Sequence, residues 1–150
     1  MQGRLQIAKL SLVLLLGTTA ASAQVKLQGS MLDRKVQGLA LDRLSHAEIF
    51  AMGPVGFAYK TSQEEIDYRL ILGQPTALVS FERLYAEGNM QARSYALTGI
   101  RQLSPARFEE LYASLPDSKD QVTTMNGCLL SYETLRDVAQ RLATPPSPGK

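Results

Sequence analysis

The sequence predicts a mainly α fold, a compact array of about five to six short antiparallel helices behind a cleaved signal peptide. Three observations support this expectation. Residues that start and stop helices alternate at short intervals from Ser45 onward, apolar residues recur between them at helical spacing, and the N-terminus has the composition of an export signal. The chain has 150 residues, 45% of them hydrophobic, which suits one globular core.

Residues 1–23 have the order of a secretory signal peptide. Arg4 and Lys9 precede an apolar run over 10–16, and small residues at 21–23 form the cleavage site. The apolar run is shorter than the roughly 20 residues that span a membrane. We therefore expect a mature protein that is exported to the periplasm or secreted, without a membrane anchor.

Removal of the signal peptide balances the charge. The chain has 16 Lys and Arg against 14 Asp and Glu, and the signal peptide takes with it two basic residues, Arg4 and Lys9, and no acidic ones. A balanced surface lacks the one-signed field that attracts nucleic acid or anionic lipid. We expect neither of these as a partner, and instead another envelope or secreted protein.

The region 24–44 is predicted to be an N-terminal arm that is partly disordered or helical. Residues 25–28 alternate like a short strand, whereas the apolar residues after them fit a helix interrupted by Gly38. The residues at helical spacing are Leu32, Val36, Leu39 and Ala40. A helical domain over 45–143 is expected to follow.

Two capping boxes are predicted to start helices, Ser45 with Glu48 and Ser62 with Glu65. In this motif the hydroxyl accepts the free N–H of the third helical residue, and the carboxylate reaches back to the cap. The second box opens a helix predicted over 64–72, which ends before a glycine.

Glycine and proline bound the next three helices, which are predicted over 75–87, over 90–103 and from Pro105 onward. The residues Gly88 and Asn89 separate the first two. The predicted apolar faces are Leu78, Phe81, Leu84 and Tyr85; then Ala92, Ala96, Leu97, Ile100 and Leu103; then Phe108, Leu111, Tyr112 and Leu115.

Two stretches are predicted to be loops. Glycine and proline within 53–57 would cost roughly 1 and 3 kcal/mol each in a helix interior, and 116–130 is rich in turn-forming residues, with a tight turn of positive φ expected at Asn126-Gly127. A last helix is predicted over about 131–142, followed by a frayed tail over 144–150. Its inward residues would be Leu135, Val138, Ala139 and Leu142.

A hexapeptide occurs twice, at 81–86 and 108–113, with five of six positions identical. It indicates either a helical repeat whose units stack on a shared core or two amphipathic helices with similar packing residues. In both cases Phe81 and Phe108 should point into the core, and the differing Arg83 and Glu110 should point outward.

The segment 94–100, between these two helices, is similar to the inner helix of a HEAT-like hairpin. On these residues the chain resembles small exported bacterial proteins of uncharacterised function that have a HEAT-like helical-hairpin core. The resemblance covers about 53–142 and implies stacked hairpins. It carries no catalytic motif.

The sequence excludes most kinds of reactive or metal-binding site. His46 and Cys128 are the only residues of their types, so a histidine and cysteine zinc site or a Ser-His-Asp triad is hard to assemble, and an internal disulfide is excluded. Asp117 and Asp120 miss the spacing of a calcium loop. We expect no catalytic residue, metal or cofactor. Cys128 is expected to be a small buried hydrophobe, with pairing between chains or thiol reactivity as the alternatives.

Tyrosines are the best sequence argument for a binding surface, since tyrosine is enriched at protein interfaces. The alternative is that they line the rim of the core with their hydroxyls in water. Tyr68 and Tyr95 are expected to be exposed binding residues, because each lies beside the main apolar stripe of its helix. The six tyrosines are Tyr59, Tyr68, Tyr85, Tyr95, Tyr112 and Tyr132.

These features predict an exported soluble helical protein that acts as a protein-interaction module of inhibitor, immunity or chaperone-like type, rather than an enzyme. The alternative is a small carboxylate-dependent envelope hydrolase, since glycan cleavage needs only two carboxylates. Its candidates are Glu64, Glu65, Asp67, Glu82, Glu87, Glu109 and Glu110, and the four last named would be tested first.

Overall fold

The structure, a computed structural model, describes residue 31 and residues 33–144. The predicted signal peptide, residues 24–30 of the predicted arm and the tail beyond residue 144 lie outside the described residues. Residues 31 and 33–36 belong to a separate unit and are helical. None of the helices in the described part of the chain has the length and apolar character needed to cross a membrane.

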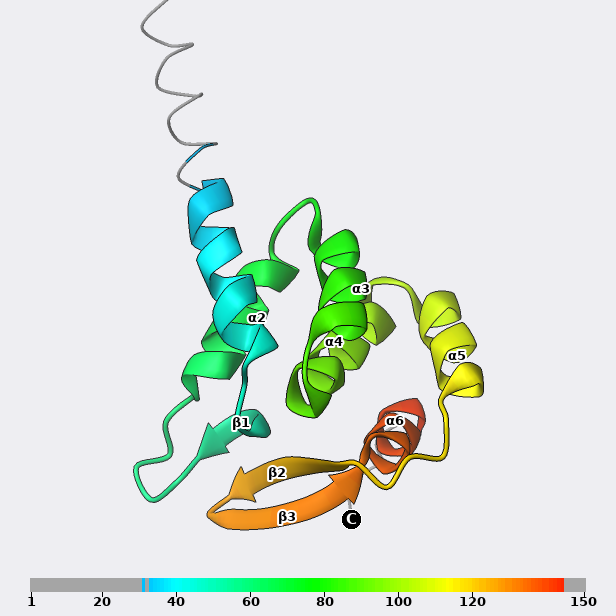
Figure 1. Cartoon of the computed structure of the whole chain (residues 1–150). Helices are drawn as coiled ribbons and strands as arrows, with labels where there is room; N and C mark the ends of the chain where they lie inside the picture. Colours follow the sequence, from blue (N-terminus) through cyan, green and yellow to red (C-terminus); the bar gives the residue numbers. More distant parts are fainter. Residues whose placement is uncertain (1–30, 32, 145–150) are drawn as a thin grey trace, which may run out of the picture. The chain divides into compact units, whose positions relative to one another are not determined.

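The compact unit that begins at residue 37 is predominantly helical and also contains a small sheet (Figure 1). Its first residues, 37–45, are helical, and this helix ends at Ser45. It is followed by β1 (Phe50–Val55), α2 (Gln63–Leu72), α3 (Ala77–Glu87), α4 (Met90–Leu103), α5 (Pro105–Ser114), β2 (Gln121–Gly127), β3 (Leu129–Thr134) and α6 (Leu135–Ala143). The sheet order is β1-β2-β3, with β1 parallel and β3 antiparallel to β2.

The predicted helix boundaries from α2 to α5 are largely confirmed. Helix α4 has the predicted bounds, and α2 ends at Gly73, whose N–H donates to the Arg69 carbonyl. Asn89 caps α4, because its side chain accepts the N–H of Ala92 at 2.9 Å. Helix α3 begins two residues later than predicted, since a turn in which Ala77 N–H donates to the Gln74 carbonyl precedes it.

The two predicted capping boxes have different outcomes. The prediction at Ser45 is wrong: a helix ends there, and the Ser45 hydroxyl donates to the carbonyl of Asp42 at 2.7 Å. Ser62 does cap α2, since its Oγ accepts the Glu65 N–H at 3.1 Å. The Glu65 carboxylate does not complete the box. It is buried and accepts the N–H of Gly53 in β1 at 2.7 Å.

The sheet corrects the expectation of a purely helical array. The predicted loop 53–57 lies partly in β1, whose pairing shifts register between Ala51 and Val55 and which forms one edge of the sheet, where proline is tolerated. The predicted loop 116–130 contains β2, and residues 131–134, predicted to be helical, lie in β3.

The hairpin turn and the start of α6 lie slightly further along the chain than predicted. The turn residues between the paired Asn126 and Leu129 are Gly127 and Cys128, and Gly127 has φ 58°, as the first position of a type II′ turn requires. Helix α6 begins after Thr134, which forms a capping box with Asp137.

Helix α4 lies at the centre of the core and packs against α3, α5, α6 and the first two strands. Phe81 and Phe108 are buried as predicted, at 0% and 1% exposure, and Arg83 and Glu110 are exposed as predicted. The Phe81 ring lies over Gly99 of α4, where an added Cβ would be 2.4 Å from the ring. The two matching hexapeptides therefore supply core residues on the two helices that flank α4.

Candidate interaction surface

Tyr68 and Tyr95, predicted to be exposed binding residues, are buried at 2% and 0% exposure, and that prediction is wrong. The Tyr95 hydroxyl donates to the carbonyl of Ala51 at 2.9 Å and accepts the N–H of Ala51 at 3.0 Å. The Tyr68 hydroxyl donates to Gln102 at 3.2 Å. Burial raises the pKa of each phenol to about 12. Both tyrosines are core residues, and Tyr95 anchors β1.

Two buried acidic residues on α2 also have structural roles. Glu65 accepts hydrogen bonds from Arg69 at 2.6 and 3.0 Å, in addition to the Gly53 N–H. Asp67 pairs with Arg43 of the helix over 37–45, and this contact raises the pKa of the Arg43 guanidinium. The hydrogen bond from Gly53 attaches β1 to α2, and the Arg43 pair attaches the helix over 37–45 to α2. A buried carboxylate held in this way is satisfied rather than poised for catalysis.

The four leading hydrolase candidates lie on helix surfaces, and they do not all meet in one site. Arg107 binds Glu82 at 3.0 Å and Glu110 at 2.6 Å. Glu87 borders a cavity of about 380 Å³ between the helix over 37–45 and α3, whereas Glu109 borders another, of about 560 Å³, beside α5. Two of the four, Glu82 and Glu110, are thus brought together, and both are held in ion pairs with the same arginine.

The candidates for metal and thiol chemistry lie apart. Among the described residues no cluster of three or more His, Cys, Asp or Glu side chains could hold a metal ion. His46 is exposed at the end of a helix, with Nδ1 3.0 Å from the Asp42 carbonyl. Cys128 is exposed in the hairpin turn, so the expectation of a buried thiol is wrong.

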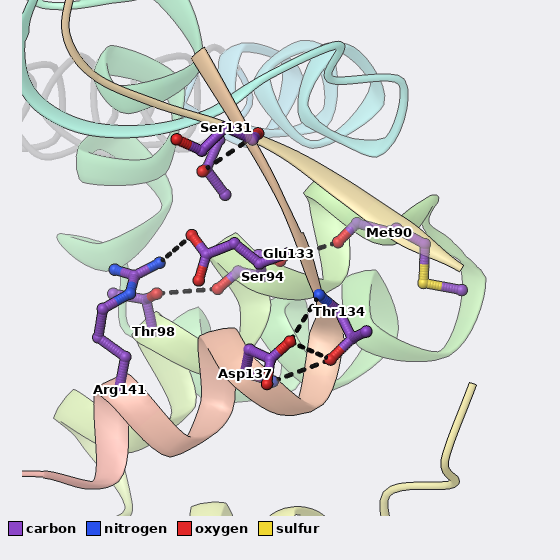
Figure 2. Close-up of polar contacts among 9 residues, drawn as sticks. Met90, Ser94, Thr98, Ser131, Glu133, Thr134, Asp137 and Arg141 are labelled. Carbon is purple, nitrogen blue, oxygen red and sulfur yellow. Dashed lines mark hydrogen bonds and ion pairs between the residues drawn. The ribbon is translucent and has the colours of Figure 1, made fainter. Parts of the chain in front are cut away.

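A cavity of about 430 Å³ lies between the sheet and helices α4 and α6. Figure 2 shows Glu133 of β3 and Arg141 of α6 pointing toward each other, and their ion pair measures 2.8 Å. Thr98 of α4, which also lines this cavity, donates its hydroxyl proton to the Ser94 carbonyl at 2.8 Å. Glu133 is the one acid in the lining. The polar groups here join β3 to α6 and form no nucleophile with a general base.

The capping box at the start of α6 strengthens the same junction (Figure 2). The Asp137 carboxylate accepts the Thr134 hydroxyl at 2.7 Å and the Thr134 N–H at 3.0 Å. These hydrogen bonds lower the pKa of Asp137, and the bond from the Thr134 hydroxyl has the larger effect. The end of β3 is thus held firmly, which makes β3 a well-supported edge strand.

Exposed apolar side chains gather at one end of the sheet. We call this cluster the tip: Phe57 is 97% exposed, Tyr59 76% and Leu129 74%. The Gly56 N–H donates to the Gly127 carbonyl at 2.9 Å, which places the turn after β1 beside the hairpin turn. Clusters of large exposed apolar residues typically mark interaction sites.

The backbone at Tyr59 gives a second reason to consider the tip functional. Tyr59 has φ 47°, the only positive φ of a non-glycine residue in the described part of the chain. A bulky residue in this left-handed region costs of order 1–3 kcal/mol, and such residues cluster at functional sites. The neighbouring Lys60 is exposed and has no ion-pair partner among the residues that the structure describes.

β3 is the other exposed part of the sheet. It pairs with β2 on one side, and in the described part of the chain no strand covers its other side (Figure 1). Leu130 and Tyr132 are 53% and 65% exposed. This edge differs from the sequence prediction, which places a loop over 116–130 and a helix from residue 131. Strand-forming residues on both sides of Asn126-Gly127 were the hairpin signal that could have revealed it.

A comparison of the chain with known proteins finds no matching family model and no significantly similar curated protein or solved structure.

Proposed function

We propose that this protein is an exported protein-interaction module that binds an envelope or secreted protein through the tip formed by Phe57, Tyr59 and Leu129. The observation that carries the proposal is that these exposed apolar side chains lie on or directly beside two adjoining turns. Inhibitor, immunity and chaperone-like proteins all need such a surface. The exposed carboxylates on the helix surfaces support a hydrolytic site less well than the tip supports binding.

The chemistry of the tip indicates the kind of partner surface. Aromatic side chains presented on a turn fill an apolar pocket, and tyrosine is among the residues that contribute most binding energy at interfaces. Lys60 adds one positive charge beside them. The complementary surface is an apolar pocket with an acidic rim, because opposite charges at the rim steer and orient association.

Binding through the tip is tested by capture from an envelope extract. We expect the wild-type chain to retain a stoichiometric partner, and the double variant Phe57→Ser, Tyr59→Ser to bind it at least about tenfold more weakly. Val79→Ser is the matched control, since Val79 is 68% exposed on α3, outside the tip. Repeated absence of a stoichiometric partner, or equal capture by the double variant, would contradict the proposal.

Export is tested by the intact mass of the protein in the envelope fraction. The basic flank, apolar run and small-residue site at the N-terminus support cleavage after Ala23. We expect a mass that lacks residues 1–23. A mass that retains these residues, or a protein confined to the cytosolic fraction, would overturn the exported part of the proposal.

A further inference from the structure

We propose that β3 pairs antiparallel with β3 of a second copy of this chain, so that two three-stranded sheets become one continuous sheet across a two-fold axis. The pairing uses the edge of β3 that faces away from β2. It involves Leu129 of the tip but leaves Phe57 and Tyr59 outside the paired strands, and it stands whether or not the tip binds a partner.

The hydrogen-bonding groups on the open edge follow from the hairpin. Leu129 closes the two-residue turn opposite Asn126, and in such a hairpin the closing pair is hydrogen-bonded and every second pair after it is too. The residues between them direct their N–H and C=O groups away from β2. Leu130 and Tyr132 therefore present two N–H and two C=O groups at the open edge.

The side chains at this edge complement a second copy. Val122 and Thr124 of β2 are buried against the helices, and the residues opposite them in β3 are Glu133 and Ser131. Leu130 and Tyr132 consequently lie on the other face of the sheet. A pair of strands centred on Ser131 places Leu130 of each copy opposite Tyr132 of the other, and aromatic and aliphatic residues in such cross-strand pairs stabilise a sheet.

The side chains and charges of β3 suit a second copy as the occupant. The one charged residue of β3, Glu133, is held by Arg141 of its own chain and, in this register, lies opposite Leu129 of the second copy. The net charge of the chain is only +2, so two copies repel each other weakly. Natural sheets block open edges with lysine, proline or bulges. Residues 129–134 contain no lysine or proline, and their pairing with β2 is regular.

The experiment is sedimentation velocity of the purified chain over a concentration series, in reducing buffer so that the exposed Cys128 forms no disulfide. We expect wild type to form a dimer. Leu130→Lys, Tyr132→Lys puts lysine opposite lysine twice and should weaken association at least about tenfold. Leu130→Lys, Tyr132→Glu puts lysine opposite glutamate in this register and should associate at least about tenfold more tightly than the double-lysine variant. Val79→Lys is the control and should dimerise as wild type does.

Three results would overturn the inference: a wild-type chain that is monomeric at all concentrations, a double-lysine variant that dimerises as tightly as wild type, or a lysine and glutamate variant no tighter than the double-lysine one. If a variant does not fold, amide hydrogen exchange of wild type decides. The N–H groups of Leu130 and Tyr132 should gain protection as concentration rises, and exchange independent of concentration would contradict the pairing.

Discussion

Replacing Phe81 or Phe108 by alanine is expected to lower the free energy of unfolding by about 3–5 kcal/mol, because each change leaves a cavity in a closely packed core. Phe81 packs over Gly99, and its ring centroid lies 5.3 Å from that of Tyr68. Phe108 stacks on Tyr112 with the ring centroids 6.1 Å apart. The loss is a large part of the 5–15 kcal/mol that is typical of a small domain.

Arg83→Ala is the matched control for these two variants. Arg83 lies two residues after Phe81 and pairs with Glu87 at 2.9 Å, with both side chains more than 60% exposed. Exposed ion pairs contribute little, so the change should stay within about 0.5 kcal/mol. Chemical denaturation of the three variants measures the difference. Equal unfolding free energies would mean that the matching hexapeptides do not supply the core.

Replacing Tyr95 by phenylalanine is expected to destabilise the fold by about 2–4 kcal/mol, since each buried polar group left without a partner costs about 1–3 kcal/mol. The change removes one oxygen atom, yet it leaves both the N–H and the carbonyl of the buried Ala51 unpaired. Tyr59→Phe is the control, because Tyr59 is 76% exposed. A loss of stability as small as that of the control would show that Tyr95 does not anchor β1.

The same substitution has a signature at high pH. Burial raises the pKa of Tyr95 and of Tyr68 from 10.0 to about 12, so the folded state favours the neutral phenols. The stability that this shift represents is complete below pH 10 and is lost as the pH rises toward 12. We expect Tyr95→Phe to lose less stability than wild type over this interval. An identical pH dependence in the two proteins would contradict a buried Tyr95 phenol.

Helix ends could be predicted from the sequence because the residues that set them act on their own backbone. Gly73 and Gly88 follow helices, and Asn89 caps the next helix with its own side chain. The same local reasoning failed at Ser45, where the hydroxyl bonds backward to Asp42 and ends a helix instead of starting one. A serine with a glutamate three residues later fits either situation until packing selects one.

The strands could not be predicted in the same way. Phe50 of β1 pairs with Thr124 of β2, a neighbour that lies far along the chain, and only that pairing makes a strand of a segment with glycine and proline. The hairpin from β2 to β3 is local, but its strands are short, and β3 is mostly exposed. Hydrophobic periodicity, which depends on burial of one face, is therefore weak in it.

Local sequence and tertiary packing decided different features of the core and of the candidate surface. The sequence by itself determined the helix boundaries around α4, the inward direction of Phe81 and Phe108, and the small net charge of +2, because these depend on residue type and local spacing. Which tyrosines are buried was decided only by the tertiary structure. Tyr95 is drawn inward because the backbone of Ala51, distant in sequence, needs a hydrogen-bond partner, whereas Tyr59 is left on a turn that no other described element covers. Burial is a property of what packs against a residue, and the residue itself does not encode it.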